Sequence, residues 1–196
     1  MKRILSALSL LVVAASASAQ LSNPPATAKT FAGYNGAPAL ETGVLTSGTQ
    51  GALQSGSAGT LSFTFLGKEA NDSNRFMFAI GSQTILDTAA VGTTISGVIA
   101  PGLVGFSFTD TTTGTTYANG TAAGNLATVY VSGITTTNYG AFDYIIGFND
   151  NGSADGDFDD FVVGVRLTPP VPEPETYALM LAGLGAVGFM ARRRRA

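Results

Sequence analysis

The stretch Thr60-Leu-Ser-Phe-Thr-Phe-Leu-Gly67 (TLSFTFLG) decides the fold class of this chain. Its bulky apolar residues alternate with small polar ones, so that Leu61, Phe63 and Phe65 share one face of an extended segment. Side chains in a β-strand point alternately to opposite faces, and a period of two is therefore typical of a strand with one buried face. The stretch predicts a half-buried β-strand.

Six further runs have the same short, apolar-rich character. They lie at residues 75–80, 82–86, 103–109, 127–132, 142–148 and 161–167. Turns rich in Gly, Asn and Thr separate them, including Asn119-Gly120 and the Thr run after Asp110, and no amphipathic helix interrupts them. Many short strands with such turns predict an all-β fold. We expect an antiparallel, jelly-roll-like sandwich over residues 20–167, in which residues 20–59 are rich in loops.

The composition of the 196-residue chain fits a β-domain with an aromatic core and excludes several kinds of chemistry. Twelve Phe and no Trp supply the bulky apolar side chains, and only 12% of the residues are charged. Because Cys and His are absent, the chain has no Cys-His or Ser-His-Asp catalytic group, no His or Cys ligand for zinc and no disulfide. Residues 20–170 contain four Lys or Arg and eleven Asp or Glu, and this net charge of −7 argues against binding to nucleic acid.

The beginning of the chain has the three parts of a secretory signal peptide in the right order. They are the basic pair Lys2-Arg3, the apolar residues 4–15 and the small residues Ala17-Ser18-Ala19. The last part matches the pattern at which signal peptides are cleaved. We therefore expect residues 1–19 to direct export and to be removed in front of Gln20.

An uncharged apolar segment, residues 177–191, is followed directly by an Arg cluster. At about 1.5 Å per residue a helix of this length reaches roughly 22 Å, which is less than the roughly 30 Å of a bilayer's hydrocarbon core. Its place after an exported domain and the positive-inside rule nevertheless favour a single transmembrane helix. The basic tail, residues 192–196, would then face the cytoplasm and the domain would lie outside. A Pro-rich linker at residues 168–176 precedes the helix.

The segment VPEPETYALMLAGLGAVGFMARRRRA, residues 171–196, resembles the PEP-CTERM sorting signal of Gram-negative bacteria. The resemblance rests on a Pro-Glu-Pro motif, a short apolar helix and a terminal Arg cluster, in that order. The residues of the motif and the cluster are Pro172, Glu173, Pro174, Arg192, Arg193, Arg194 and Arg195. The resemblance implies export, transient membrane anchoring and recognition by an exosortase, which is a membrane-embedded transpeptidase-like enzyme. It also implies a bacterium that makes extracellular polysaccharide or biofilm.

A dense acidic stretch, FNDNGSADGDFDDF at residues 148–161, has the composition of a metal site. Its candidate ligands are Asn149, Asp150, Asn151, Asp155, Asp157, Asp159 and Asp160. Oxygen ligands in a Gly-containing loop suit Ca²⁺, and a bound cation would relieve the repulsion between the carboxylates. The spacing differs from that of an EF-hand, because Asp160 and Arg166 stand where that loop needs Gly and Glu. The alternative is an acidic turn without metal, in which Asp and Asn act as turn formers.

Two functions remain open from the sequence. The first is a non-enzymatic protein of the cell envelope or extracellular matrix, associated with biofilm or exopolysaccharide and sorted by its C-terminal signal. The second is a carbohydrate-binding or carbohydrate-active module that acts on extracellular polysaccharide, and an exposed groove lined by tyrosines would favour it. The tyrosines that such a groove could use are Tyr117, Tyr130, Tyr139 and Tyr144. No spacing selects the pair of carboxylates that a glycosidase needs, so we expect no enzymatic activity.

The signal-peptide prediction is tested by the N-terminus of the mature chain. Mass spectrometry of the protein from the membrane and secreted fractions of an exporting host should find Gln20 as the first residue. A mature chain that retains Met1 would contradict the prediction.

Overall fold

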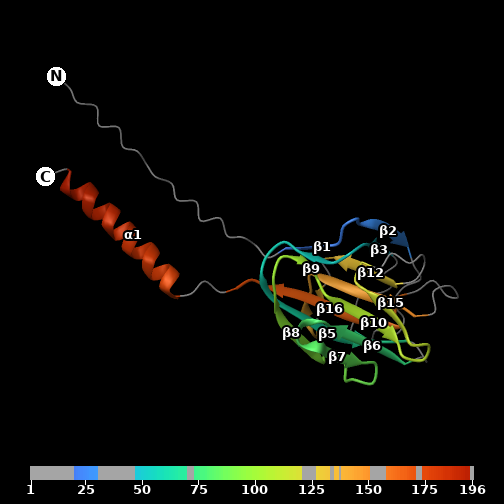
Figure 1. Ribbon diagram of the computed structural model, residues 1–196. Helices are drawn as coiled ribbons and strands as arrows, with labels where there is room; N and C mark the ends of the chain where they lie inside the picture. The colour runs from blue at the N-terminus through green and yellow to red at the C-terminus, as the bar shows by residue number, and fades with distance from the viewer. Residues whose placement is uncertain are drawn as a thin grey trace.

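The computed structural model describes residues 20–30, 47–69, 73–120, 127–132, 135–136, 138–150, 158–170 and 174–194. Within these ranges every strand pairing is antiparallel, and one α-helix follows the last strand (Figure 1). The predicted all-β, antiparallel class is thus confirmed.

The largest sheet has seven strands in the order β2-β3-β12-β15-β16-β5-β8. Their bounds are β2 (Thr27–Thr30), β3 (Ser47–Gln50), β12 (Ala127–Ser132), β15 (Tyr144–Asn149), β16 (Phe161–Thr168), β5 (Gly59–Gly67) and β8 (Thr94–Ile99). Strand β16 pairs with β15 on one side and with β5 on the other. Its first five residues are buried without interruption, which explains why its sequence is an apolar run and does not alternate.

A second sheet has four strands in the order β11-β10-β6-β7. Their bounds are β11 (Thr115–Ala118), β10 (Phe106–Asp110), β6 (Asn74–Phe78) and β7 (Gln83–Leu86). Two small sheets complete the described strands. They consist of β1 (Leu21–Ser22), β4 (Gln54–Ser55) and β9 (Gly102–Leu103), and of β13 (Thr135–Thr136) with β14 (Gly140–Ala141). A 3₁₀ turn, η1 (Ile80–Ser82), connects β6 to β7.

Phenylalanine rings join the two large sheets. Phe63 of the seven-stranded sheet lies with its ring centroid 4.7 Å from that of Phe76 in the four-stranded sheet. Phe108 stacks on Phe148 across the same interface, with 4.8 Å between the centroids. All four side chains are fully buried. The inward faces of both sheets therefore share one aromatic core, which is what the alternating pattern of TLSFTFLG required.

A second group of buried apolar side chains lies outside this main core. Its members are Leu66, Phe142, Ile145, Phe158 and Val162. The ring of Phe142 covers Gly164 of β16 so closely that a Cβ atom at position 164 would lie 2.6 Å from it. Only glycine fits there, because any larger residue would displace the ring. The seven-stranded sheet thus buries part of its other face as well.

Each of the seven predicted runs overlaps one strand of the two large sheets, namely β5, β6, β7, β10, β12, β15 or β16. Strands β2 and β3 lie in the stretch that was expected to be rich in loops, and beyond that stretch the sequence analysis missed β8 and β11 of the large sheets. Strand β11 reads TTYA and is mostly exposed, so it lacks the apolar alternation of a half-buried strand. Strand β8 has Gly97 at an inward position, where a Cβ atom would lie 2.6 Å from the Ile80 side chain. The strand therefore lacks a bulky apolar residue at this position, and its apolar alternation is interrupted.

The C-terminal helix α1 runs from Pro174 to Arg193, and Figure 1 shows it away from the sheets. In the described part of the chain, no helix combines the length and the apolar character needed to cross a membrane. The prediction of a transmembrane helix over residues 177–191 is therefore not supported. The physical reason is that Glu175 lies in the first turn and Arg192 in the last, so the apolar part of α1 is shorter than a bilayer core.

Removing one ring from the shared core should destabilise the domain strongly. Phe108→Ala takes away a fully buried ring that contacts rings of both sheets. We expect the free energy of unfolding to fall by about 3–5 kcal/mol, measured by urea denaturation of the mature protein. Leu86→Ala is the matched control, because Leu86 is 50% exposed and its truncation should cost about 0.5 kcal/mol or less. Equal losses in the two variants would contradict this account of the core.

Candidate functional site

The predicted acidic loop begins and ends at buried carboxylates. Four of its candidate ligands are described, and all of them are at most 8% exposed: Asn149, Asp150, Asp159 and Asp160. The other three, Asn151, Asp155 and Asp157, lie outside the described residues. The backbone N–H of Asp150 donates a hydrogen bond of 2.8 Å to Oδ2 of Asp160. This bond joins the end of β15 to the start of β16, so the predicted loop has a fixed base.

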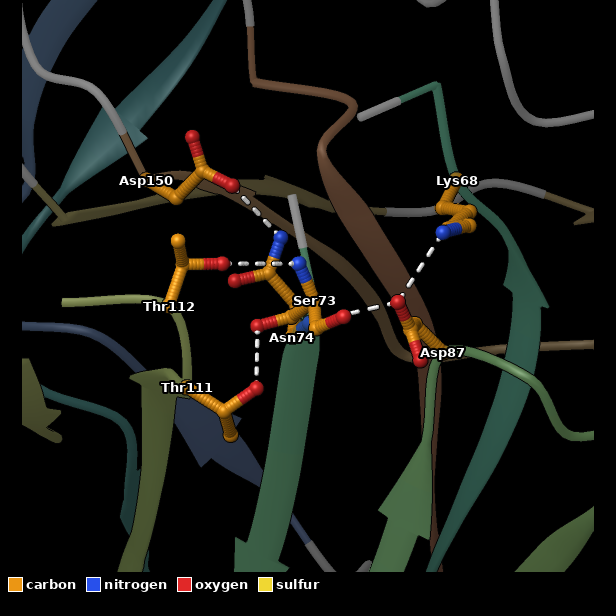
Figure 2. A network of polar contacts seen from close by, with 7 residues as sticks. All are labelled: Lys68, Ser73, Asn74, Asp87, Thr111, Thr112 and Asp150. Atoms are coloured by element: carbon orange, nitrogen blue, oxygen red, sulfur yellow. Dashed lines mark hydrogen bonds and ion pairs between the residues drawn. The ribbon is translucent and has the colours of Figure 1, made fainter. Parts of the chain in front are cut away.

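Residues from other strands surround this base, and the sequence analysis did not identify them. Figure 2 shows Asn74, the first residue of β6, between Asp150 and Asp87. The Asn74 side-chain Nδ2 donates to Asp150 Oδ2 at 2.6 Å, and its backbone N–H donates to Asp87 Oδ2 at 3.3 Å. Lys68 Nζ forms an ion pair with the same Asp87 oxygen at 2.9 Å. We call this end of the two sheets, with Asp87, Asp110, Asp150, Asp159 and Asp160, the acidic end.

Asp110 serves the turn that follows β10, as the sequence predicts. Its carboxylate accepts hydrogen bonds from the backbone N–H of Thr112 at 2.7 Å and of Thr113 at 3.1 Å, and also from the Thr113 hydroxyl. Burial alone would raise the pKa of Asp110, but the hydrogen bonds from Thr113 and Thr112 outweigh it and hold this pKa below its ordinary value. Asp110 is thus an ionised turn former.

The described residues do not by themselves assemble a carboxylate metal site. Among them, no three Asp, Glu, His or Cys side chains lie close enough together to hold a metal ion. The loop's calcium site therefore stays a prediction, and so does the alternative of a metal-free acidic turn.

The four candidate tyrosines differ in their exposure. Tyr130 is 1% exposed, whereas Tyr139 is 39% exposed. Tyr144 and Tyr117 are half-buried, and the Tyr117 ring packs against Phe148 of the core. Tyr130 therefore lines no exposed groove, and Tyr117 contributes to the core.

Tyr130 and Asn119 instead form a buried network at the end of β10 that is opposite the acidic end. The Tyr130 hydroxyl donates to Asn119 Oδ1 at 2.8 Å, and the same oxygen accepts the backbone N–H of Leu53 at 2.8 Å. Asn119 Nδ2 donates to the carbonyl oxygens of Leu53 at 2.8 Å and of Val104 at 2.7 Å. Every polar atom of the Asn119 side chain thus has a partner. Asn119 was predicted as a turn residue, and the structure shows that its buried side chain also hydrogen-bonds to Leu53, Val104 and Tyr130.

The C-terminal helix has an ordered basic end and an apolar surface. Arg192 and Arg193 occupy its last turn and Arg194 follows it, which places positive charge at the negative end of the helix dipole. The described side chains of residues 176–194 are all exposed, including Leu179 at 74% and Phe189 at 68%. An exposed apolar surface of this kind is typical of a segment that binds a membrane or another protein.

Residues 170–195 match the family model of the PEP-CTERM protein-sorting motif. A search of curated proteins and a search of solved structures found no match to the chain.

The PEP-CTERM motif confirms the resemblance drawn from the sequence, and it implies export, membrane anchoring before sorting and recognition by an exosortase. Of the predicted motif residues, Pro174 begins α1, while Pro172, Glu173 and Arg195 lie outside the described residues. At the other end of the chain, Ala17 and Ala19 also lie outside them. The expected new N-terminus, Gln20, is described and exposed, and its carbonyl oxygen accepts the N–H of Gly56 at 2.9 Å.

The buried Tyr130 hydroxyl should make the domain sensitive to alkaline pH. Burial raises the pKa of Tyr130 to about 12, against about 10 in an unfolded chain. Between these values the unfolded state releases the proton first, so stability is complete below pH 10 and falls as the pH rises toward 12. The loss should reach about 2–3 kcal/mol.

Urea denaturation at pH 8, 10 and 11.5 measures this loss. Tyr130→Phe should cost about 1 kcal/mol at pH 8 by removing the bond to Asn119, and it should remove the alkaline loss that Tyr130 causes. Tyr139→Phe, at an exposed tyrosine, is the control and should keep the full loss. An unchanged alkaline loss in Tyr130→Phe would contradict the role of the buried hydroxyl.

Proposed function

We propose that this chain is a non-enzymatic protein of the bacterial cell envelope or extracellular matrix that an exosortase sorts through its C-terminal PEP-CTERM motif. The observation that carries the proposal is the match of residues 170–195 to that motif. The Pro-Glu-Pro motif, the apolar helix and the Arg cluster all fall inside it. The β-domain is the part that remains outside the membrane, and its role lies in biofilm or exopolysaccharide.

The surface of α1 supports anchoring before sorting. Apolar side chains such as Leu179, Leu181 and Phe189 are exposed to water. Burying apolar surface away from water is favourable by roughly 25 cal/mol for each Å². A membrane provides the apolar environment that covers them, and the Arg residues at the helix end remain at its polar surface. An anchor of this kind holds the chain where a membrane-embedded enzyme reaches the Pro-Glu-Pro motif.

The packing of the large sheets supports a β-sandwich as the exported domain. Rings of the two sheets contact one another across a shared core, as Phe63 does with Phe76 and Phe108 with Phe148. The buried polar residues Asn119 and Asp110 form hydrogen bonds that stabilise turns and link segments of the domain. These features favour a binding or structural protein over an enzyme. Carbohydrate recognition is the less favoured alternative, since Tyr130 and Tyr117 serve the core.

Replacing Pro172, Glu173 and Pro174 together with Ala tests the proposed sorting. We expect the variant to accumulate in the membrane fraction as an unprocessed chain, because the motif, and not the apolar run, is what the exosortase recognises. Immunoblots of membrane and secreted fractions measure this. A Pro169→Ala variant is the control and should mature normally, because Pro169 belongs to the same linker but lies outside the matched motif. Normal maturation of the triple variant in a host that has the exosortase would overturn the proposal.

A further inference from the structure

The chain enters and leaves the β-domain at the same end. The carbonyl oxygen of Gln20, the expected first residue after export, accepts the N–H of Gly56 at 2.9 Å. Close by in the chain, a Cβ atom at Gly59 would lie 2.6 Å from the carbonyl oxygen of Thr168, the last residue of β16. The predicted signal peptide and the C-terminal linker therefore meet the domain near one another. We call this end, which lies at the other end of β16 from Asp160, the linker end.

Large apolar side chains are exposed at the linker end. Val98 of β8 is 73% exposed, and Leu103 of β9 is 62% exposed. Val98 is the register partner of Thr60, which pairs in turn with Thr168, while β9 pairs with β4 and through it with β1. Ile80 is 43% exposed in the turn η1, which connects β6 to β7 at the same end. Single exposed apolar residues are ordinary, but several at one end of a domain indicate a contact with another apolar body.

The linker end carries little charge that such a contact would remove from water. Residues 53–60, 79–83 and 97–106, which form its turns and strand ends, contain no Asp, Glu, Lys or Arg. Among the described residues, the nearest charged side chains are Arg166 of β16 and Asp143 before β15, and they have opposite signs. Removing a charge from water costs free energy, so an end without charges is the one that an apolar environment covers most easily.

A short tether connects the linker end to the C-terminal helix. Six peptide steps separate Thr168 from Pro174, the first residue of α1, and a fully extended chain covers at most about 20–22 Å in that length. When α1 anchors the chain, the linker end therefore stays close to the membrane surface. A tether this short gives an effective concentration in the millimolar range, so weak contacts between the domain and the membrane are sufficient.

We propose that the linker end rests on the lipid surface through Leu103, Val98 and Ile80 while the chain is anchored. The inference rests on the proposed anchoring by the C-terminal segment and adds a second membrane contact to it. The three apolar side chains enter the boundary between headgroups and acyl chains, as those of interfacial segments do, and the acidic end points away from the membrane. The contact keeps the Pro-Glu-Pro motif at the membrane surface. It ends when α1 is removed, because the tether is then lost.

Single-cysteine labelling tests the proposal, because the chain itself has no Cys. The full chain with a nitrobenzoxadiazole label at Leu103→Cys or Leu86→Cys is reconstituted into phosphatidylethanolamine–phosphatidylglycerol vesicles, with and without spin-labelled lipids that quench the label. Leu86 is the matched control, since it is 50% exposed and directly precedes Asp87 at the acidic end. Interfacial side chains lie about 5–10 Å deep, so quenching at 103 should exceed that at 86 by about twofold or more. Equal quenching at the two positions would overturn the proposal.

A third label, at Val187→Cys in α1, distinguishes failure of this inference from failure of the proposed anchoring. Strong quenching at 187 together with equal quenching at 103 and 86 would show an anchored chain whose domain does not rest on the lipid. That result would overturn the inference alone. Absence of quenching at 187 would overturn the anchoring, and the inference with it.

A charge at Val98 separates apolar contact from mere proximity caused by the tether. In the chain labelled at 103, Val98→Asp should lower the quenching to the level found at 86, because a carboxylate resists transfer from water to the lipid boundary. Leu86→Asp adds the same charge at the acidic end and should leave the quenching at 103 unchanged. Both side chains are exposed, so neither substitution disturbs the core. Full quenching at 103 in the Val98→Asp chain would contradict a contact made by apolar side chains.

Discussion

The contact between phenylalanine rings of the two large sheets is the interaction on which the rest of the domain depends. Phe108 touches Phe76 in its own sheet and Phe148 and Phe161 in the other. The chain has no Cys, so no disulfide supplements this burial after export. The core fixes the separation and the register of the sheets. It thereby decides which polar residues meet at the ends of the strands.

Two asparagines form hydrogen bonds between the two large sheets, one at each end of β10. Asn119 follows β11 and reaches Tyr130 of the seven-stranded sheet, while Asn74 begins β6 and reaches Asp150 beyond the same large sheet. Each therefore joins the two sheets through a buried hydrogen bond. The two differ in how complete the arrangement is: Asn119 has a partner for each polar atom, whereas Asn74 Oδ1 has none.

Local pattern predicted the strands and the sorting motif, but it did not predict the acidic end. Alternation in TLSFTFLG and the order of the parts in residues 171–196 are properties of contiguous sequence, and the strand and the sorting motif were both confirmed. The predicted half-burial of the strand holds only for its first part, because residues 63–67 are all buried. Asn74 stands alone in NRFMF, and it meets Asp150 only because the sheets bring together residues 76 positions apart. The burial of Asn119 arises in the same way, since its turn sequence gives no sign of Leu53 or Tyr130. The transmembrane prediction was not supported. It relied on the position of the helix after an exported domain and on the positive-inside rule, although the apolar run is shorter than a bilayer core.

The end of the last strand explains how sorting leaves the domain intact. Strand β16 ends at Thr168, which pairs with Thr60 of β5, and Pro169 and Pro170 follow it with exposed side chains. Proline has no N–H to donate, so the sheet cannot extend into the linker. The motif begins at residue 170, and none of the described strand pairings or core contacts involves residues after it. Cleavage within the motif would therefore remove the exposed apolar helix and its basic end without breaking any described hydrogen bond of either large sheet. Anchoring and folding are thus independent, which is the physical condition for a chain that is held at a membrane first and sorted afterwards.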